Sequence, residues 1–155
     1  MRPLRRGWLL MESIVDIKSR FNDLDILKVY EDCVYMPTQE KLLKQAANLM
    51  SKPSVSIFGF CDNEKVIGVI AVDQLEDGTA VIRGIAADPE HRKRGIGKQL
   101  VQHVCKALPI TELHAETHEG AVEFYQKCGF ETERFLRKFD SGEYVRYRCV
   151  LHVNR

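Results

Sequence analysis

Apolar residues along the chain follow two spacings, one typical of β-strands and the other typical of α-helices. Three short apolar runs separated by polar turns, at 55–61, 65–72 and 79–87, predict an antiparallel meander. Elsewhere, apolar residues that recur at every third or fourth position predict helices. The predicted strands are 12–17, 55–61, 65–72, 79–87, 112–117, 130–139 and 143–151. The predicted helices are 24–34, 38–50, 96–108 and 120–128.

This order of elements predicts an α+β (mixed α/β) domain built around one central sheet. The chain has 155 residues, which fits one domain with a substantial core, and we place that domain at residues 11–155. The first ten residues read MRPLRRGWLL, and a second methionine follows at position 11. Their apolar patch is shorter than the core of a signal peptide. We therefore expect residues 1–10 to be a leader or tag outside the fold, disordered or loosely docked.

The composition argues against several classes of partner. The 23 Lys and Arg residues nearly balance the 22 Asp and Glu residues, for a net charge of +1, unlike a dedicated nucleic-acid-binding protein. Five cysteines are scattered without a C-x-x-C pair, which predicts reduced core thiols and neither a disulfide framework nor a zinc site. The longest apolar run, 66–72, is too short to span a membrane. The sequence thus predicts a cytoplasmic protein without metal, membrane or nucleic-acid partners.

The helix predicted at 96–108 begins with an unusual charge pattern, HRKRGIGK over residues 91–98. A helix N-terminus carries partial positive charge and favours acidic residues, yet this one is surrounded by cations. Glycines at positions 95 and 97 leave the backbone N–H groups uncovered, so a phosphate could bind there. The alternative is a solvated charged loop in which the glycines only make a turn. The cations are Arg92, Lys93, Arg94 and Lys98.

Two common phosphate-binding loops do not fit this segment. A Walker A loop would need glycine at Arg92 and Ser or Thr at Gln99. A dinucleotide-binding loop would need its third glycine at Leu100. The remaining pattern, R-x-x-G-x-G between a strand and a helix, does not by itself identify the ligand.

Two linked segments, IAADPEHRKRGIG (85–97) and HEGAVEFYQKCGF (118–130), together resemble the GNAT superfamily of N-acetyltransferases. The order of elements fits this family over nearly all of residues 12–151. The resemblance implies a single central, mostly antiparallel sheet of about six to seven strands with about four flanking helices. It also implies transfer of an acetyl group from acetyl-coenzyme A to a primary amine by direct attack, without a covalent enzyme intermediate.

The resemblance further implies which residues bind the cofactor. The turn and helix N-terminus would hold its pyrophosphate. The end of the preceding strand would present backbone groups to the pantetheine arm, and a backbone N–H there would polarise the thioester carbonyl. The implied pyrophosphate residues are Arg92, Lys93, Arg94, Gly95, Ile96, Gly97 and Lys98. The implied strand residues are Ile85, Ala86 and Ala87.

For catalysis, the resemblance assigns Tyr125 to protonate the departing thiolate. The same tyrosine also falls on the apolar stripe of its helix, so a packing role is the alternative. Glu116, His114 and His118, on or just after the strand 112–117, are candidates for the base that deprotonates the amine, and ordered water is another. His118 stands where the family often has Asn, so it could bind the cofactor instead.

Other readings of the sequence stay open. The same fold could hold coenzyme A as a sensor without turnover. Binding of nucleic acid by the RKR cluster is a further reading, and the near-neutral net charge argues against it. The acceptor is not identified, and a small-molecule amine or a peptide amine fits equally. Related domains often dimerise, and an exposed edge in the last strands is where a second copy would pair.

Overall fold

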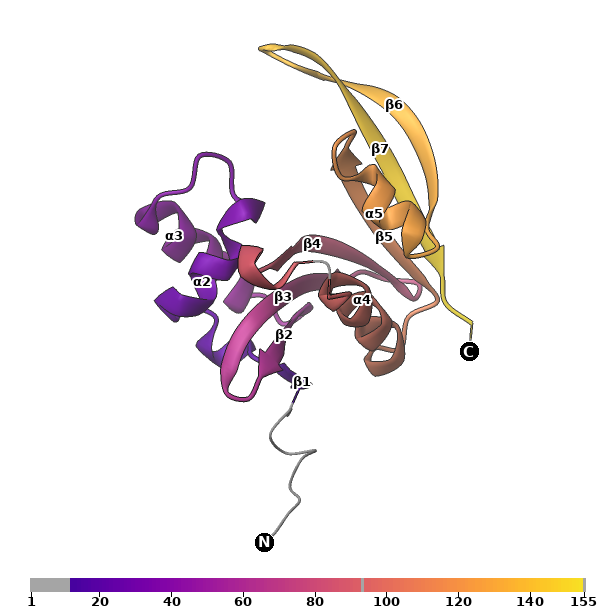
Figure 1. Cartoon of the computed structure of the whole chain (residues 1–155). Helices are drawn as coiled ribbons and strands as arrows, with labels where there is room; N and C mark the ends of the chain where they lie inside the picture. The colour runs from indigo at the N-terminus through magenta and orange to yellow at the C-terminus, as the bar shows by residue number, and fades with distance from the viewer. Residues whose placement is uncertain (1–11, 93, 155) are drawn as a thin grey trace, which may run out of the picture.

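The computed structural model describes residues 12–92 and 94–154, so the predicted leader at 1–10 and Lys93 lie outside the described residues. One seven-stranded sheet, in the order β1-β2-β3-β4-β5-β7-β6, runs through the molecule (Figure 1). The strands are β1 (Glu12–Asp16), β2 (Val55–Asp62), β3 (Lys65–Gln74), β4 (Thr79–Ala87), β5 (Glu112–His118), β6 (Glu131–Phe139) and β7 (Gly142–His152). The helices are α2 (Leu24–Tyr30), α3 (Gln39–Met50), α4 (Ile96–Ala107) and α5 (Val122–Lys127). Short 3-10 turns form η1 (Lys18–Arg20), η2 (Glu31–Cys33) and η3 (Pro89–His91).

The sheet is antiparallel except where β4 pairs with β5 in parallel. Strands β2, β3 and β4 form the predicted meander, and the α+β fold class is confirmed. A parallel pair needs a crossover connection, and α4 supplies it between β4 and β5.

Two apolar cores lie on the two faces of the sheet. One contains Ile70 and Val72 of β3 together with residues of α4 and α5, and the other contains Val69 and Ala71 together with residues of α2 and α3. Alternation along β3 therefore fills both cores, which explains why 66–72 reads as a continuous apolar run. The run is a strand buried on both faces.

The helix predicted at 24–34 is shorter than expected. Asp23 caps its start by accepting a hydrogen bond from the Asp25 N–H, but α2 ends at Tyr30 and tightens into η2. Such 3-10 turns are common at helix ends. Because the helix ends in this turn, Asp32 and Cys33 lie over β4. A longer helix would have placed them elsewhere. The helix predicted at 120–128 is likewise reduced to Val122–Lys127.

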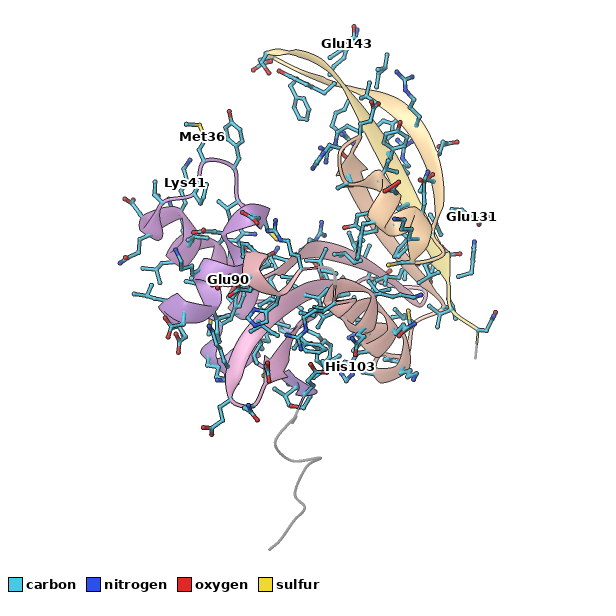
Figure 2. The ribbon with its side chains drawn as sticks, in the orientation of Figure 1. Met36, Lys41, Glu90, His103, Glu131 and Glu143 are labelled. Atoms are coloured by element: carbon cyan, nitrogen blue, oxygen red, sulfur yellow. The ribbon has the colours of Figure 1, made fainter. Side chains whose placement is uncertain are left out.

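A bulge in β4 separates the two halves of the sheet. Ala71 and Val72 of β3 pair with Gly84 and Ile82, so Arg83 is an extra residue on β4. Pairing between β4 and β5 ends nearby, at Val81 opposite His114. A bulge bends its strand and increases the local twist. Beyond the bulge, β5, β7 and β6 diverge from β4 (Figure 1). Met36, in the loop before α3, and Glu143, near the tip of the β6–β7 hairpin, lie on the two sides of the space that results (Figure 2).

Replacing Gly84 by alanine tests how tightly α2 packs on the bulged strand. The added Cβ would lie 2.1 Å from the Tyr30 hydroxyl oxygen, and that tyrosine is fully buried. We expect Gly84→Ala to lower the free energy of unfolding by about 1–3 kcal/mol, measured by chemical denaturation. The penalty should shrink but persist in a Tyr30→Phe background, because the hydroxyl is gone while the ring atoms at 2.6 and 2.8 Å remain. Equal penalties in both backgrounds would mean that the hydroxyl is not the obstacle.

Candidate active site

A cavity of about 1010 Å³ occupies the gap between β4 and β5. Its walls come from β4, β5, the start of α4, α5 and η2, so it collects elements from both faces of the sheet. The residues predicted from sequence that line it are Ile85, Ala86, Ala87, Arg92, Gly95, Ile96, Gly97, Lys98, Glu116, His118 and Tyr125. The structure thus brings together nearly all of the predicted site.

The N-terminus of α4 opens into this cavity without a cap. Gly95 precedes the helix in the left-handed conformation (φ 75°), no side chain in the described ranges caps the helix, and its first turn contains no acidic residue. By contrast, Asp23 and Thr38 cap α2 and α3. The first-turn N–H groups of a helix have no partner within the helix. At α4 they are left for an anion in the cavity.

The three predicted cations that the structure describes at this turn play different roles. Arg92 lines the cavity, but its Nη2 donates to Asp32 Oδ2 at 2.5 Å. Arg94 does not line the cavity: it turns toward β1 and β2, where it forms ion pairs with Glu12 and Asp62. Lys98 lines the cavity and has no ion-pair partner in the described part of the chain. Of the described cations at this turn, Lys98 is the one whose charge is not already balanced.

Past the bulge, β4 pairs with a strand on one side only among the described residues. It remains paired with β3 as far as Ala87 opposite Gly68, whereas β5 no longer follows it. A strand edge without a neighbour presents a row of backbone donors and acceptors. Cys33 Sγ donates to the Ile85 carbonyl at 3.4 Å, and burial raises the pKa of this thiol to about 12. The edge is therefore a ready surface for an extended ligand, beside a thiol that stays protonated.

Tyr125 projects from α5 into the floor of the cavity. The side chain is 7% exposed and packs edge-on against Phe124 and Phe130, with ring centroids 5.1 and 5.2 Å away. Burial, reinforced by neighbouring cysteines such as Cys149, raises its pKa above the usual value. No hydrogen bond to another described residue engages its hydroxyl. The result is a neutral phenol with an uncommitted O–H group at the cavity.

Glu116 and His118 also reach the cavity, but their acceptor atoms are engaged. Arg137 donates two hydrogen bonds to the Glu116 carboxylate, at 2.9 and 2.5 Å, and Arg146 donates a third at 3.1 Å. These bonds, those from Arg137 first, hold the pKa of Glu116 below its usual range. His118 Nδ1 accepts from the Gly120 N–H at 3.1 Å, so the neutral ring carries its proton on Nε2.

Sequence reasoning missed several residues of the cavity wall. Arg83 had a visible signal, because it is a lone charge in an otherwise apolar strand. Asp32 and Cys33 had none, because η2 positions them only through tertiary packing. Arg146 sits in a strand that alternates arginine with apolar residues, and only the sheet order shows which arginine reaches the cavity.

Two further findings concern metals and membranes. Within residues 12–92 and 94–154, no group of three His, Cys, Asp or Glu side chains is arranged to hold a metal ion. None of the helices in the same ranges combines the length and hydropathy needed to cross a bilayer.

The sequence matches the Acetyltransferase (GNAT) family over residues 24–130. The chain belongs to the GNAT family. It is therefore an acetyltransferase, and acetyl transfer to amines is the general activity of GNAT proteins. The match spans β2 to β4, α4, β5 and α5, which are the elements that build most of the cavity.

Individual GNAT proteins agree with this assignment. An uncharacterised N-acetyltransferase of Bacillus methanolicus is 28% identical over 97 residues, 61% of this chain and 79% of its own. The ribosomal-protein-S18-alanine N-acetyltransferase of Escherichia coli has the same fold, with a TM-score of 0.69 and 20% identity over 94% of this chain and 96% of its own. A Bacillus subtilis acetyltransferase solved in complex with coenzyme A aligns with a TM-score of 0.53 and 20% identity, over 65% of this chain and 78% of its own. The GNAT fold thus binds coenzyme A.

Proposed function

We propose that this protein transfers an acetyl group from acetyl-coenzyme A to a primary amine by direct attack inside the cavity between β4 and β5. The observation that carries the proposal is one continuous cavity that contains an uncapped helix N-terminus, an unpaired strand edge and a protonated tyrosine. The helix N-terminus can bind an anion, the strand edge can pair with an extended ligand, and the tyrosine can act as a general acid.

The pyrophosphate of the cofactor binds at the start of α4. The N–H groups of Ile96, Gly97 and Lys98 supply hydrogen bonds, and the Lys98 ammonium supplies charge. Gly97 is required for a second reason, since a Cβ there would lie 2.7 Å from the Phe124 ring. The residues present therefore fit the group.

The unpaired edge of β4 holds the pantetheine arm. Backbone groups of Ile85 and Ala87, which face away from β3, pair with its amides as a neighbouring strand would. Acetyl-coenzyme A supplies the acetyl group as an activated thioester, and fixed backbone N–H groups on this edge stabilise the negative charge that develops on the carbonyl oxygen. Arg92 and Cys33 support the edge by donating to the Ala87 and Ile85 carbonyls.

Tyr125 protonates the departing thiolate. Its raised pKa keeps the phenol protonated at neutral pH, so the proton is present when the sulfur acquires charge. Cys33 is unsuited to form a covalent intermediate, because a thiol with a pKa near 12 is not a nucleophile at neutral pH. Direct attack by the amine is the simpler route.

The contacts of Glu116 and His118 favour positioning roles over base catalysis. The Glu116 carboxylate is held by two guanidinium groups, and the neutral His118 ring has its Nδ1 lone pair occupied. His114 bonds to Glu112 at 2.7 Å and does not line the cavity. We assign removal of the amine proton to solvent, and His118 Nε2–H to hydrogen bonding in the cavity.

Reversing the charge at the start of α4 tests the pyrophosphate site. Saturation with coenzyme A at about 100 times its Kd should stabilise the wild type by about 2.7 kcal/mol, visible as a rise in Tm. Lys98→Glu should lose most of that rise, because it places a carboxylate beside the phosphates. Lys106→Glu, on an exposed position in the last turn of the same helix, should keep it. Equal shifts in the two variants would refute the site.

Removing the phenol tests the acid. Tyr125→Phe should lower kcat by about 10²-fold or more while leaving the Kd for coenzyme A unchanged, because only proton donation is lost. The assay follows release of the coenzyme A thiol. Tyr147→Phe is the control, since Tyr147 contacts Glu119 outside the cavity. The wild-type rate should show no alkaline decline attributable to Tyr125 up to about pH 10. Full activity in Tyr125→Phe would reassign this tyrosine to packing.

A further inference from the structure

We propose that the acceptor of this enzyme is an amine that also carries an anionic group, such as a carboxylate, and that Arg146 binds that group. The inference rests on the proposed function and adds the class of acceptor. It comes from the charges on the part of the cavity that faces away from α5.

Register places Arg146 on the face of β5, β7 and β6 opposite α5. Ala115, Cys149 and Thr132 are neighbours across β5, β7 and β6, and α5 packs on that face through the hydrogen bond from Gln126 to Thr132. His118 and Arg146 are also paired across β5 and β7. Each lies an odd number of positions along its strand from Ala115 or Cys149, so their side chains point to the opposite face. Arg146 therefore enters the cavity from the side opposite Tyr125's helix.

The Arg146 side chain is held by a hydrogen bond from Nε, but its other N–H donors are not engaged by the described residues. Its Nε donates to Glu116 Oε2 at 3.1 Å, and its side chain is 28% exposed. Neither terminal Nη group has a hydrogen-bond partner among the described residues. A guanidinium has five N–H donors in a fixed fork, suited to carboxylate or phosphate. A fixed, largely enclosed fork with free donors at a cavity wall is a binding site for an anion.

Glu116 does not fully neutralise the charge of Arg146. The carboxylate already receives the bidentate fork of Arg137, with Nε and Nη2 at 2.9 and 2.5 Å. Two guanidinium groups on one carboxylate leave an excess positive charge on this wall. Glu116 thus orients Arg146 as a positioning residue, and the uncompensated charge stays at the cavity.

The other charged residues that line the cavity also leave an excess of positive charge. The other lining carboxylate among the described residues is Asp32, which is neutralised by Arg92. Arg83, at the bulge in β4, contacts one carboxylate of the described chain, Asp73 at 3.4 Å, and no other hydrogen bond to these residues engages its guanidinium. No unpaired carboxylate in the described lining could attract a polycation. An acceptor with a second ammonium group would be repelled, and one with a carboxylate would be attracted.

A matched panel of amines tests the class of acceptor. The carboxylated amines are glycine, β-alanine, γ-aminobutyrate and δ-aminovalerate, each compared with the alkylamine and the diamine of similar length. For at least one chain length, kcat/KM should be highest for the carboxylated amine and lowest for the diamine. Arg146→Gln should lower kcat/KM for that amine about tenfold to a hundredfold, mainly through KM, because a hydrogen-bonded ion pair is lost. The matching alkylamine should be unaffected.

Arg148→Gln is the matched control. Arg148 lies two residues along the same strand and face, pairs with Glu133 at 3.4 Å and does not line the cavity. This variant should keep the wild-type preference. The rise in Tm with coenzyme A should be the same in all three proteins, which shows that folding and cofactor binding are intact.

Calorimetry of the same amines on the protein saturated with coenzyme A gives a readout that needs no turnover. Coenzyme A binding without any preference for the carboxylated amines, in either assay, would overturn the inference and leave the proposed function standing. A preference that survives Arg146→Gln would overturn the role of Arg146. Absence of coenzyme A binding in the folded wild type would overturn the proposed function and this inference with it.

Discussion

The structure depends on the early end of pairing between β4 and β5. The two strands are parallel neighbours for only three residue pairs, from Thr79 opposite Glu112 to Val81 opposite His114. Had the pairing continued, β4 and β5 would lie side by side along their length, and their backbone hydrogen bonds would leave no space for the cavity. Because it stops, the unpaired edge, the open helix N-terminus and the buried tyrosine all face one space. The missing strand pairs are a stability cost that a bound ligand can offset by taking the place of a strand.

The opening also divides the chemistry between the two faces of the sheet. The start of α4 and the aromatic residues of α5 lie on one face, and η2 and Arg146 approach from the other. In the proposed reaction the cofactor's phosphates and the acceptor's anionic group are both attracted by positive charge, but from different faces of the sheet. That separation avoids competition between two anions for the same arginine or lysine.

Much of this could be predicted from the sequence, and the exceptions have physical causes. The meander, α4 and the glycine turn were predictable because alternation, helical spacing and glycine placement are local signals. The end of α2 was not, because Tyr30 is fixed by its burial against Phe21 and the bulged strand. Arg94 was predicted at the phosphate site, but acidic residues far away in the chain draw it to β1 and β2. Which arginine of β7 reaches the cavity depends on register with β5, which no local pattern encodes.

The extra residue at the β4 bulge has a consequence for how this strand tolerates change. Before Arg83, even-numbered residues such as Ala80 and Ile82 pack toward α4. After it the parity is inverted: Gly84 faces Tyr30 of α2, while Ile85 packs toward α4. Deleting this extra residue would restore uninterrupted alternation and leave Gly84 and Ile85 on their present faces, but it would remove the bend that parts the strands. Length at this point is therefore constrained more strictly than identity.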